Sequence, residues 1–248
     1  MDHTDYFFQI YGTLPRAGPG SNALTRRALE LMTELPESPR ILDVGCGPGM
    51  QTIELLSATS GTVLALDLMP EMTVRVRASA ESTGVSDRLE ALQQDMKEMS
   101  FPESSFDVVW SEGAIYFLGF EAGLRKVRPF IKPGGYVAVS EAVWLKPDPP
   151  PEVVDFWAEY PEIDVVPEKL AVIERVGYER VGHFVMPPTA WTEHYYDPME
   201  IRIAEKEADW RGIQAAEAVL REARNEISVF RRYSHYFSYA FFVMRRPD

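Results

Sequence analysis

The chain has 248 residues, and its 46% of hydrophobic side chains supply enough material for one continuous core. Its 38 acidic and 25 basic side chains give a net charge of −13, which disfavours nucleic acid as a partner because a phosphate backbone would be repelled. The sequence has no long apolar run and no basic signal-peptide region, and Cys46 is its only cysteine. These features predict a cytoplasmic protein without a membrane partner.

The first 145 residues alternate between short apolar runs and helical patterns. Strands are predicted at 40–44, 62–66, 89–94, 106–110 and 136–143, and helices at 22–35, 51–58, 70–83 and 120–131. Pro70 suits the first turn of a helix, and Gly84 suits its end. Strands that alternate with helices in this way predict a parallel sheet with helices on both faces.

The pattern changes after residue 145. The proline-rich segment 146–151 is excluded from helices and central strands, so we expect it to cross between layers. Helices follow at 152–160 and 168–176, a mostly helical stretch at about 198–231, and strands at 180–186 and 239–244. We expect the last two strands to form an antiparallel pair with a helical insert between them.

The strongest chemical signal is segment 41–49, Ile-Leu-Asp-Val-Gly-Cys-Gly-Pro-Gly, at the end of the first strand. Glycines there allow the backbone to approach a nucleotide-like ligand. A dinucleotide fingerprint needs glycine or alanine where this chain has Met50, and Pro48 interrupts the turn that holds a pyrophosphate. Asp43 would repel a pyrophosphate but attract a cationic amino acid. These features disfavour a nicotinamide oxidoreductase.

Two more acids follow neighbouring strands. Asp67 is placed to accept hydrogen bonds from a ribose diol, and Asp95 to accept one from an adenine amino group. Five motifs in chain order then resemble those of the class I S-adenosylmethionine-dependent methyltransferases. They are Leu-Asp-Val-Gly-Cys-Gly-Pro-Gly at 42–49, Asp67, Gln-Asp-Met at 94–96, Phe-Asp-Val-Val-Trp at 106–110 and Lys-Pro-Gly-Gly-Tyr at 132–136.

The resemblance implies S-adenosylmethionine as the cofactor. In that family the glycine turn holds the methionyl part, the acid after the second strand binds the ribose, and the Asp-Met pair flanks the adenine. The cofactor-binding candidates are Asp43, Gly45, Cys46, Gly47, Gly49, Asp67, Leu68, Asp95, Met96, Ser111 and Glu112.

The resemblance also implies an α/β fold of Rossmann-like, doubly wound type. Its mostly parallel, seven-stranded sheet would have an antiparallel final strand and a helical cap. One domain would comprise an N-terminal helical arm (1–39), a cofactor-binding core (40–145), and cap helices with the final two strands (146–248). Segments 17–21, 110–116 and 191–195 are similar to a bacterial subgroup of such proteins that has no assigned substrate.

The predicted function is transfer of a methyl group to a small-molecule acceptor by in-line displacement. The alternative is a regulatory protein that binds S-adenosylmethionine or its demethylated product without turnover. The acceptor atom stays open among oxygen, nitrogen, sulfur and carbon. The aromatic-rich termini are compatible with a homodimer interface or with a lid.

Three residues are catalytic candidates. Glu112, after the fourth strand, would contact the acceptor or remove its proton, or instead bind the cofactor amino group or a helix N-terminus. Tyr116 would line the methyl site or pack in the core, and His194 would act as a base or cap a helix at the surface. Arg16 would help the arm close over the cofactor or remain solvated. No metal is expected, because Glu112, Glu141 and His194 show no short ligand spacing.

Overall fold

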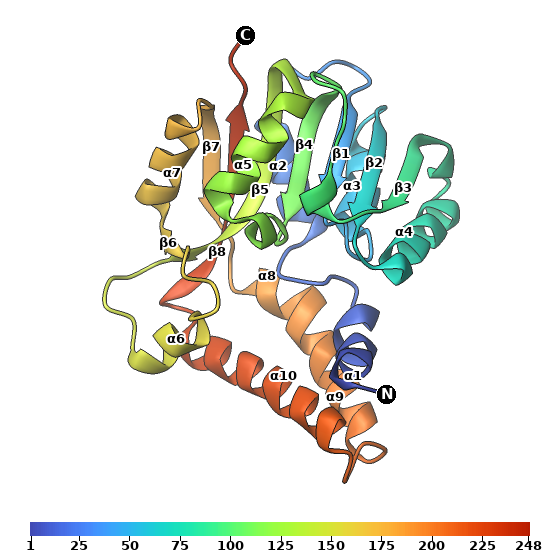
Figure 1. Cartoon of the computed structure of the whole chain (residues 1–248), viewed down its shortest axis with the longest axis vertical. Helices are drawn as coiled ribbons and strands as arrows, with labels where there is room; N and C mark the ends of the chain where they lie inside the picture. The colour runs from blue at the N-terminus through green and yellow to red at the C-terminus, as the bar shows by residue number, and fades with distance from the viewer.

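The computed structural model describes residues 1–248 and consists of a mixed sheet flanked by helices, with a helical layer beyond one end of its strands (Figure 1). The strand order is β3-β2-β1-β4-β5-β8-β7, and the short β6 pairs with β5. The strands are β1 (Arg40–Val44), β2 (Thr62–Asp67), β3 (Leu89–Gln93), β4 (Phe106–Glu112), β5 (Ile131–Trp144), β6 (Asp164–Val165), β7 (Glu179–Val185) and β8 (Phe237–Arg245).

Strands β1 to β6 pair in parallel, whereas β8 runs antiparallel to both β5 and β7. The predicted fold class, with its antiparallel final strand, is confirmed. The sheet has eight strands rather than the expected seven, because Asp164 and Val165 pair with Val143 and Trp144 and add β6. A two-residue strand leaves no periodic signal in a sequence.

The helices occupy both faces of the sheet and the layer beyond one end of its strands. They are α1 (His3–Ile10), α2 (Asn22–Glu30), α3 (Met50–Ala58), α4 (Pro70–Thr83), α5 (Phe120–Val127), α6 (Pro151–Phe156), α7 (Val166–Arg175), α8 (Thr189–Trp191), α9 (Asp197–Glu207) and α10 (Gln214–Tyr233). Short turns of 3₁₀-helix are η1 (Tyr11–Thr13), η2 (Ser86–Arg88), η3 (Met96–Glu98), η4 (Ile115–Leu118) and η5 (Arg128–Phe130), and η6 (Thr192–Tyr196) is a turn of π-helix. None of the helices is both long and apolar enough to cross a membrane.

Local sequence explains most of the boundaries. Pro70 opens α4, and Gly84 ends it in a left-handed conformation with φ of +72°, as predicted. The helix predicted to end at residue 131 stops at Val127, because Pro129 cannot donate the next hydrogen bond. The chain then enters β5 at Ile131, five residues earlier than predicted, because Ile131 pairs with Phe106 across a bulge.

One other helical prediction needs correction. The helix expected over 22–35 ends at Glu30, a few residues before Pro36. The mostly helical stretch expected over 198–231 is present as two helices, α9 and α10, and the chain turns between them, where Gly212 has a φ of +81°. The N-terminal arm contains α1, whose position in residues 3–10 was not predicted.

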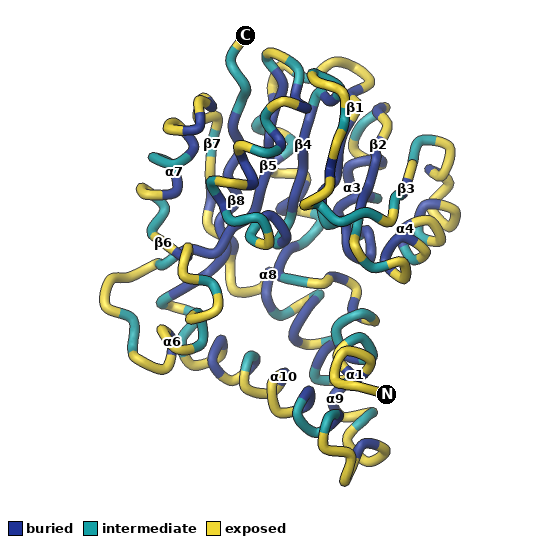
Figure 2. The backbone as a smooth tube through the Cα atoms, viewed as in Figure 1, coloured by how far each residue is buried: buried dark blue, intermediate teal, exposed yellow.

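Each central strand is buried on both faces, as Figure 2 shows for β4, β5 and β8. Alternate residues point to opposite sides, so Ile41 joins one hydrophobic cluster and Leu42 joins the other. The cluster that contains Ile41 continues into the helical layer through Trp191 and Phe230.

The helical layer lies beyond the carboxyl ends of the parallel strands, where α1 packs against α9 and α10 from the far end of the chain (Figure 1). The ring of Tyr6 on α1 meets that of Trp210 edge to face, with centroids 4.9 Å apart. Helices α1, α9 and α10 therefore meet over the carboxyl ends of the strands, where α/β proteins bind ligands, whereas the C-terminus lies at the opposite end of the sheet (Figure 1).

Candidate functional site

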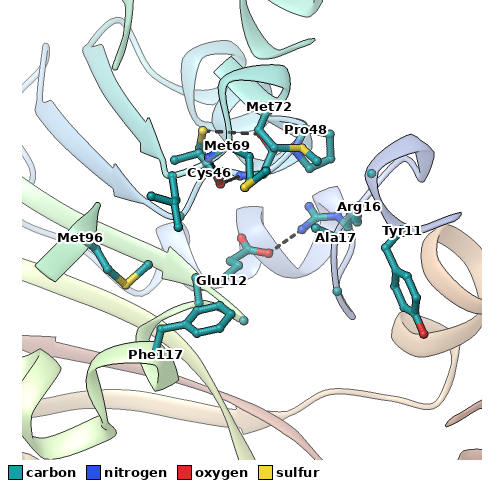
Figure 3. Close-up of a pocket in the computed structure, with 18 of the residues that line it drawn as sticks. Tyr11, Arg16, Ala17, Cys46, Pro48, Met69, Met72, Met96, Glu112 and Phe117 are labelled. Atoms are coloured by element: carbon teal, nitrogen blue, oxygen red, sulfur yellow. Dashed lines mark hydrogen bonds and ion pairs between the residues drawn. The ribbon is translucent and has the colours of Figure 1, made fainter. Parts of the chain in front are cut away.

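A cavity of about 520 Å³ lies between the carboxyl ends of the strands and the helical layer (Figure 3). We divide its lining into two walls. The strand wall comprises Gly45, Cys46, Gly47, Pro48, Asp67, Leu68, Asp95, Met96 and Glu112. The aromatic wall comprises Phe7, Phe8, Tyr11, Tyr116, Phe117, Tyr195 and Glu226. The volume is in the range of small-molecule sites.

The glycine loop between β1 and α3 has no room for side chains. Gly45 and Gly49 have φ of +72° and +92°. A Cβ on Gly45 would lie 2.4 Å from the Cβ of Ala114, and one on Gly49 would lie 2.3 Å from Cγ2 of Val76. The backbone N–H groups of Gly45 and Cys46 both donate to the carbonyl of Leu66, which holds the loop against the end of β2. The sequence therefore needs these glycines for the loop to close.

Asp67 fixes the next part of the strand wall. Its Oδ2 accepts a hydrogen bond from the N–H of Gly47 at 2.8 Å, and its Oδ1 accepts one from the N–H of Met69 at 2.9 Å. Burial raises the pKa of Asp67, and the backbone donors oppose that rise. Each carboxylate oxygen keeps a further lone pair, so Asp67 can accept hydroxyl donors from a ligand in the cavity.

Asp95 and Met96 complete the strand wall after β3. Asp95 begins η3, where its Oδ1 accepts a hydrogen bond from the N–H of Lys97 at 2.8 Å. Both residues line the cavity, as does the exposed Leu68. The structure therefore brings together eight of the eleven cofactor-binding candidates. They are Gly45, Cys46, Gly47, Asp67, Leu68, Asp95, Met96 and Glu112.

The other three candidates, Asp43, Gly49 and Ser111, do not line the cavity. Asp43 is fully buried under the loop because the first turn of α3 covers it. Its Oδ2 accepts from Thr52 Oγ1 at 2.5 Å and Gln51 Nε2 at 3.4 Å, while its Oδ1 has no partner. Burial raises the pKa of Asp43 to about 7. Ser111 Oγ donates instead to the carbonyl of Val44 inside the sheet, at 2.8 Å.

Glu112 is held by three donors at the end of β4. Arg16 Nη1 lies 2.6 Å from its Oε2, and Thr25 Oγ1 and Trp110 Nε1 donate to its Oε1 at 2.6 and 2.9 Å. The Arg16 and Glu112 side chains are only 3% and 2% exposed, and Figure 3 shows the pair across the cavity floor. The expectation that the Arg16 side chain is solvated is therefore wrong. Arg16 instead ties the N-terminal arm to β4.

The aromatic wall contains an acid that the sequence did not reveal. Glu226 of α10 accepts hydrogen bonds from the hydroxyls of Tyr11 at 3.1 Å and Tyr195 at 2.9 Å. Burial raises the pKa of Glu226, and these hydroxyls oppose the rise. The available signal was its spacing, since Glu226 falls on the same helical face as the buried Ala223 and Phe230.

Two of the catalytic candidates line the cavity and one does not. Glu112 and Tyr116 are in the lining, whereas the neighbour of His194, Tyr195, takes the place expected for the histidine. The Tyr116 ring lies 4.1 Å from that of Phe117. Burial, with smaller contributions from Glu226 and Glu141, raises the pKa of Tyr116 to about 12, so the hydroxyl is neutral near pH 7.

Glu141 on β5 forms a buried ion pair with Lys169 at 3.1 Å and accepts a hydrogen bond from Tyr160. It does not line the cavity. No group of three or more histidine, cysteine, aspartate or glutamate side chains is arranged to hold a metal ion.

Comparison with known proteins identifies the segment that carries the glycine loop. Residues 41–135 match the family model described as a methyltransferase domain. The chain is 29% identical over 170 residues to the sterol 24-C-methyltransferase of Pneumocystis carinii, a match that covers 64% of this chain and 45% of the relative. It is 29% identical over 148 residues to the 27-O-demethylrifamycin SV methyltransferase of Amycolatopsis mediterranei, covering 59% of this chain and 53% of the relative. The chain thus spans about half the length of these two curated relatives.

A solved structure shows the same fold over nearly the whole chain. It is the S-adenosylmethionine-dependent methyltransferase of Geobacter sulfurreducens in complex with S-adenosylhomocysteine, with a TM-score of 0.84, 20% identity and 98% coverage of both chains. The motifs and the family model agree that residues 41–135 are similar to a methyltransferase domain, and the whole chain shares the fold of the Geobacter sulfurreducens protein.

Proposed function

We propose that the chain is an enzyme that transfers a methyl group from S-adenosylmethionine to a small-molecule acceptor. The observation that carries this proposal is that the strand wall and the aromatic wall line the same cavity. A cofactor on the strand wall would present its reactive end to a second molecule on the aromatic wall. The names of the two curated relatives, which specify a sterol carbon and a rifamycin oxygen, support an acceptor with a large apolar body.

The strand wall fits S-adenosylmethionine. Gly45 and Gly47 line the cavity and have no side chains, so a ligand can lie against the backbone of the loop. Asp67 and Asp95 offer carboxylate acceptors to the ribose hydroxyls and the adenine amino group, and Met96 offers an apolar side chain to the base. When bound, the cofactor supplies a methyl group that its sulfonium sulfur has already activated.

The residues of the chain would then position the acceptor and exclude water. Phe7, Phe8 and Tyr11 cover the cavity from the N-terminal arm, which the Arg16–Glu112 pair holds in place. We propose that the arm (1–39) and the cap (146–248) together select the acceptor. Glu112 already accepts three hydrogen bonds, so its proposed role is to fix this closure rather than to remove a proton.

Calorimetric titration with S-adenosylmethionine, S-adenosylhomocysteine and NAD tests the cofactor half of the proposal. We expect micromolar binding of the two sulfur ligands only, and a loss of about tenfold or more in Asp67→Ala because two ribose hydroxyls lose their acceptor. Asp87→Ala, which removes an exposed acid on η2, is the matched control and should bind like the wild type. Absence of binding to both sulfur ligands, or a preference for NAD, would refute the proposal.

Methyl transfer itself is tested by incubating the enzyme with cofactor labelled in the methyl group and with fractionated metabolite extracts. Label should appear in a small molecule, with equimolar S-adenosylhomocysteine. Tight cofactor binding without transfer to any fraction would favour the regulatory alternative instead.

A further inference from the structure

Glu226 is a half-buried carboxylate without a cation. It lies on α10 between Ala223 and Phe230, on the face that packs into the protein. None of the ion pairs in the structure includes it. Its only hydrogen-bond donors are tyrosine hydroxyls, from Tyr11 and Tyr195. A carboxylate removed from water costs free energy unless a positive charge or strong donors compensate.

Two glutamates with buried side chains have such compensation. Glu112 is paired with Arg16 and Glu141 is paired with Lys169, in both cases with side chains at most 3% exposed. Glu226 lines the cavity as Glu112 does, but it differs from both residues because it lacks a basic partner. The positive charge that would balance it can therefore come from a ligand.

The surroundings of Glu226 favour a cation. Tyr11 and Tyr195 hold one carboxylate oxygen each, which fixes the direction of the charge. Phe7, Phe8 and Phe117 line the same cavity, and their ring faces attract positive groups that have lost part of their hydration. Apolar rings around one carboxylate accommodate an apolar molecule that carries a single positive charge.

This site lies apart from the strand wall. Figure 3 shows Tyr11 and Met96 on opposite sides of the cavity, with Glu112 between them. Glu226 lies beyond Tyr11 on α10, whereas Asp67 and Asp95 follow β2 and β3. A cofactor bound to the strand wall would leave the carboxylate of Glu226 for the second molecule.

From this arrangement we infer that the acceptor is an apolar molecule with a basic amine, bound as its ammonium form by Glu226 within the tyrosine and phenylalanine rings of the aromatic wall. The inference rests on the proposed function, of which it names the substrate class. It concerns how the acceptor is held, and the ammonium group can be distant from the atom that is methylated.

The test compares amines with alcohols of the same shape. The protein is saturated with S-adenosylhomocysteine and titrated with n-alkylamines from hexyl to decyl and with phenethylamine, each beside its matched alcohol. We expect at least one amine to bind about tenfold more tightly than its alcohol, because only the ammonium group gains the charge interaction. In Glu226→Gln this preference should disappear.

Glu222→Gln is the matched control, because Glu222 lies one turn earlier on the same helix, is exposed and pairs with His3. It should retain the full preference for the amine. Tyr11→Phe, which removes one hydrogen bond from Glu226, should reduce the preference about threefold. Thermal unfolding of each variant with bound S-adenosylhomocysteine establishes that the site is folded.

Four outcomes would overturn the inference. Three concern the amines, namely equal binding of amines and alcohols, binding of no amine in the series, and an amine preference that survives in Glu226→Gln. A fourth is a selective loss of S-adenosylmethionine over S-adenosylhomocysteine binding in Glu226→Gln, because the carboxylate would then serve the sulfonium of the cofactor. If the wild type binds neither sulfur ligand, the proposed function fails instead, so the two failures are distinguishable.

Discussion

The strand wall and the aromatic wall of the cavity treat negative charge in opposite ways. On the strand wall, Asp67 is held by backbone N–H groups and Glu112 by Arg16. On the aromatic wall, Glu226 has only tyrosine hydroxyls. An acid compensated by backbone N–H groups or by an arginine serves structure or a neutral donor, whereas a cavity-lining acid held only by tyrosine hydroxyls is poised to receive a cation.

The largest effect should follow removal of the arginine from the strand wall. Arg16→Met leaves Glu112 buried without its cation, which should lower the free energy of unfolding by about 3 to 5 kcal/mol. Urea denaturation of the cofactor-free protein measures this loss. Thr25 and Trp110 continue to donate to Glu112, so the fold should survive.

The double variant Arg16→Met/Glu112→Gln separates lost charge pairing from lost packing. It should recover most of the stability, because the neutral amide needs no cation. If Arg16→Met loses less than about 1 kcal/mol of unfolding free energy, Glu112 does not need its cation, and the proposed difference between the two walls is wrong.

A second test uses Asp43, a buried acid without a cation that does not face the cavity. Its pKa of about 7 in the folded state exceeds the value of 3.8 expected in the unfolded chain, so the folded protein binds more protons between these values. Its contribution therefore makes stability fall as pH rises from about 4 to about 7. Between pH 5 and pH 8 the wild type should lose about 2 to 3 kcal/mol more than Asp43→Asn.

Chemical denaturation at the two pH values measures this difference. Asp87→Asn, at an exposed position, should follow the pH dependence of the wild type. If the stability of the wild type and of Asp43→Asn changed in parallel with pH, the pKa of Asp43 would not be raised by its burial beneath the loop.

The glycine loop gives a smaller and more local effect. Gly49→Ala must adopt a φ of +92° and places its Cβ against Val76, whereas Gly84→Ala adopts a similar φ in open space. Gly84→Ala should cost about 1 kcal/mol of stability, and Gly49→Ala about 2 kcal/mol more because of the clash. If urea denaturation showed equal losses of stability in the two variants, α4 would move away from the new Cβ at no energetic cost, and the loop would not be tightly packed.

The strand wall could be predicted from the sequence because its residues lie in short, contiguous motifs. The loop at 45–49 and the acids at Asp67 and Asp95 each follow a recognisable strand, and parallel strands bring their carboxyl ends together. Asp43 was expected to face the ligand but lies below the loop, since the sequence does not reveal which neighbours cover a side chain. The rhythm of strands and helices likewise predicted the sheet but not the two-residue β6.

The aromatic wall could not be predicted in this way. Its residues come from four separate elements, as Tyr11, Tyr116, Tyr195 and Glu226 illustrate. Only the packing of α1 against α10 brings Tyr11 and Glu226 together. No spacing rule connects residues more than 200 positions apart. The acid on the apolar face of α10 was the one local irregularity that pointed to the site.

The smallest effect is expected at His194, where the sequence suggested a base. His194 lies outside the cavity lining, while the adjacent Tyr195 lines it and donates to Glu226. His194→Gln should therefore leave cofactor affinity and transfer rate within about twofold of the wild type, because no reacting group contacts the imidazole. Tyr195→Phe should weaken amine binding about threefold, because Glu226 loses one of its two donors. A large loss of transfer in His194→Gln, with cofactor binding intact, would return the histidine to the reaction and require η6 to move when the acceptor binds.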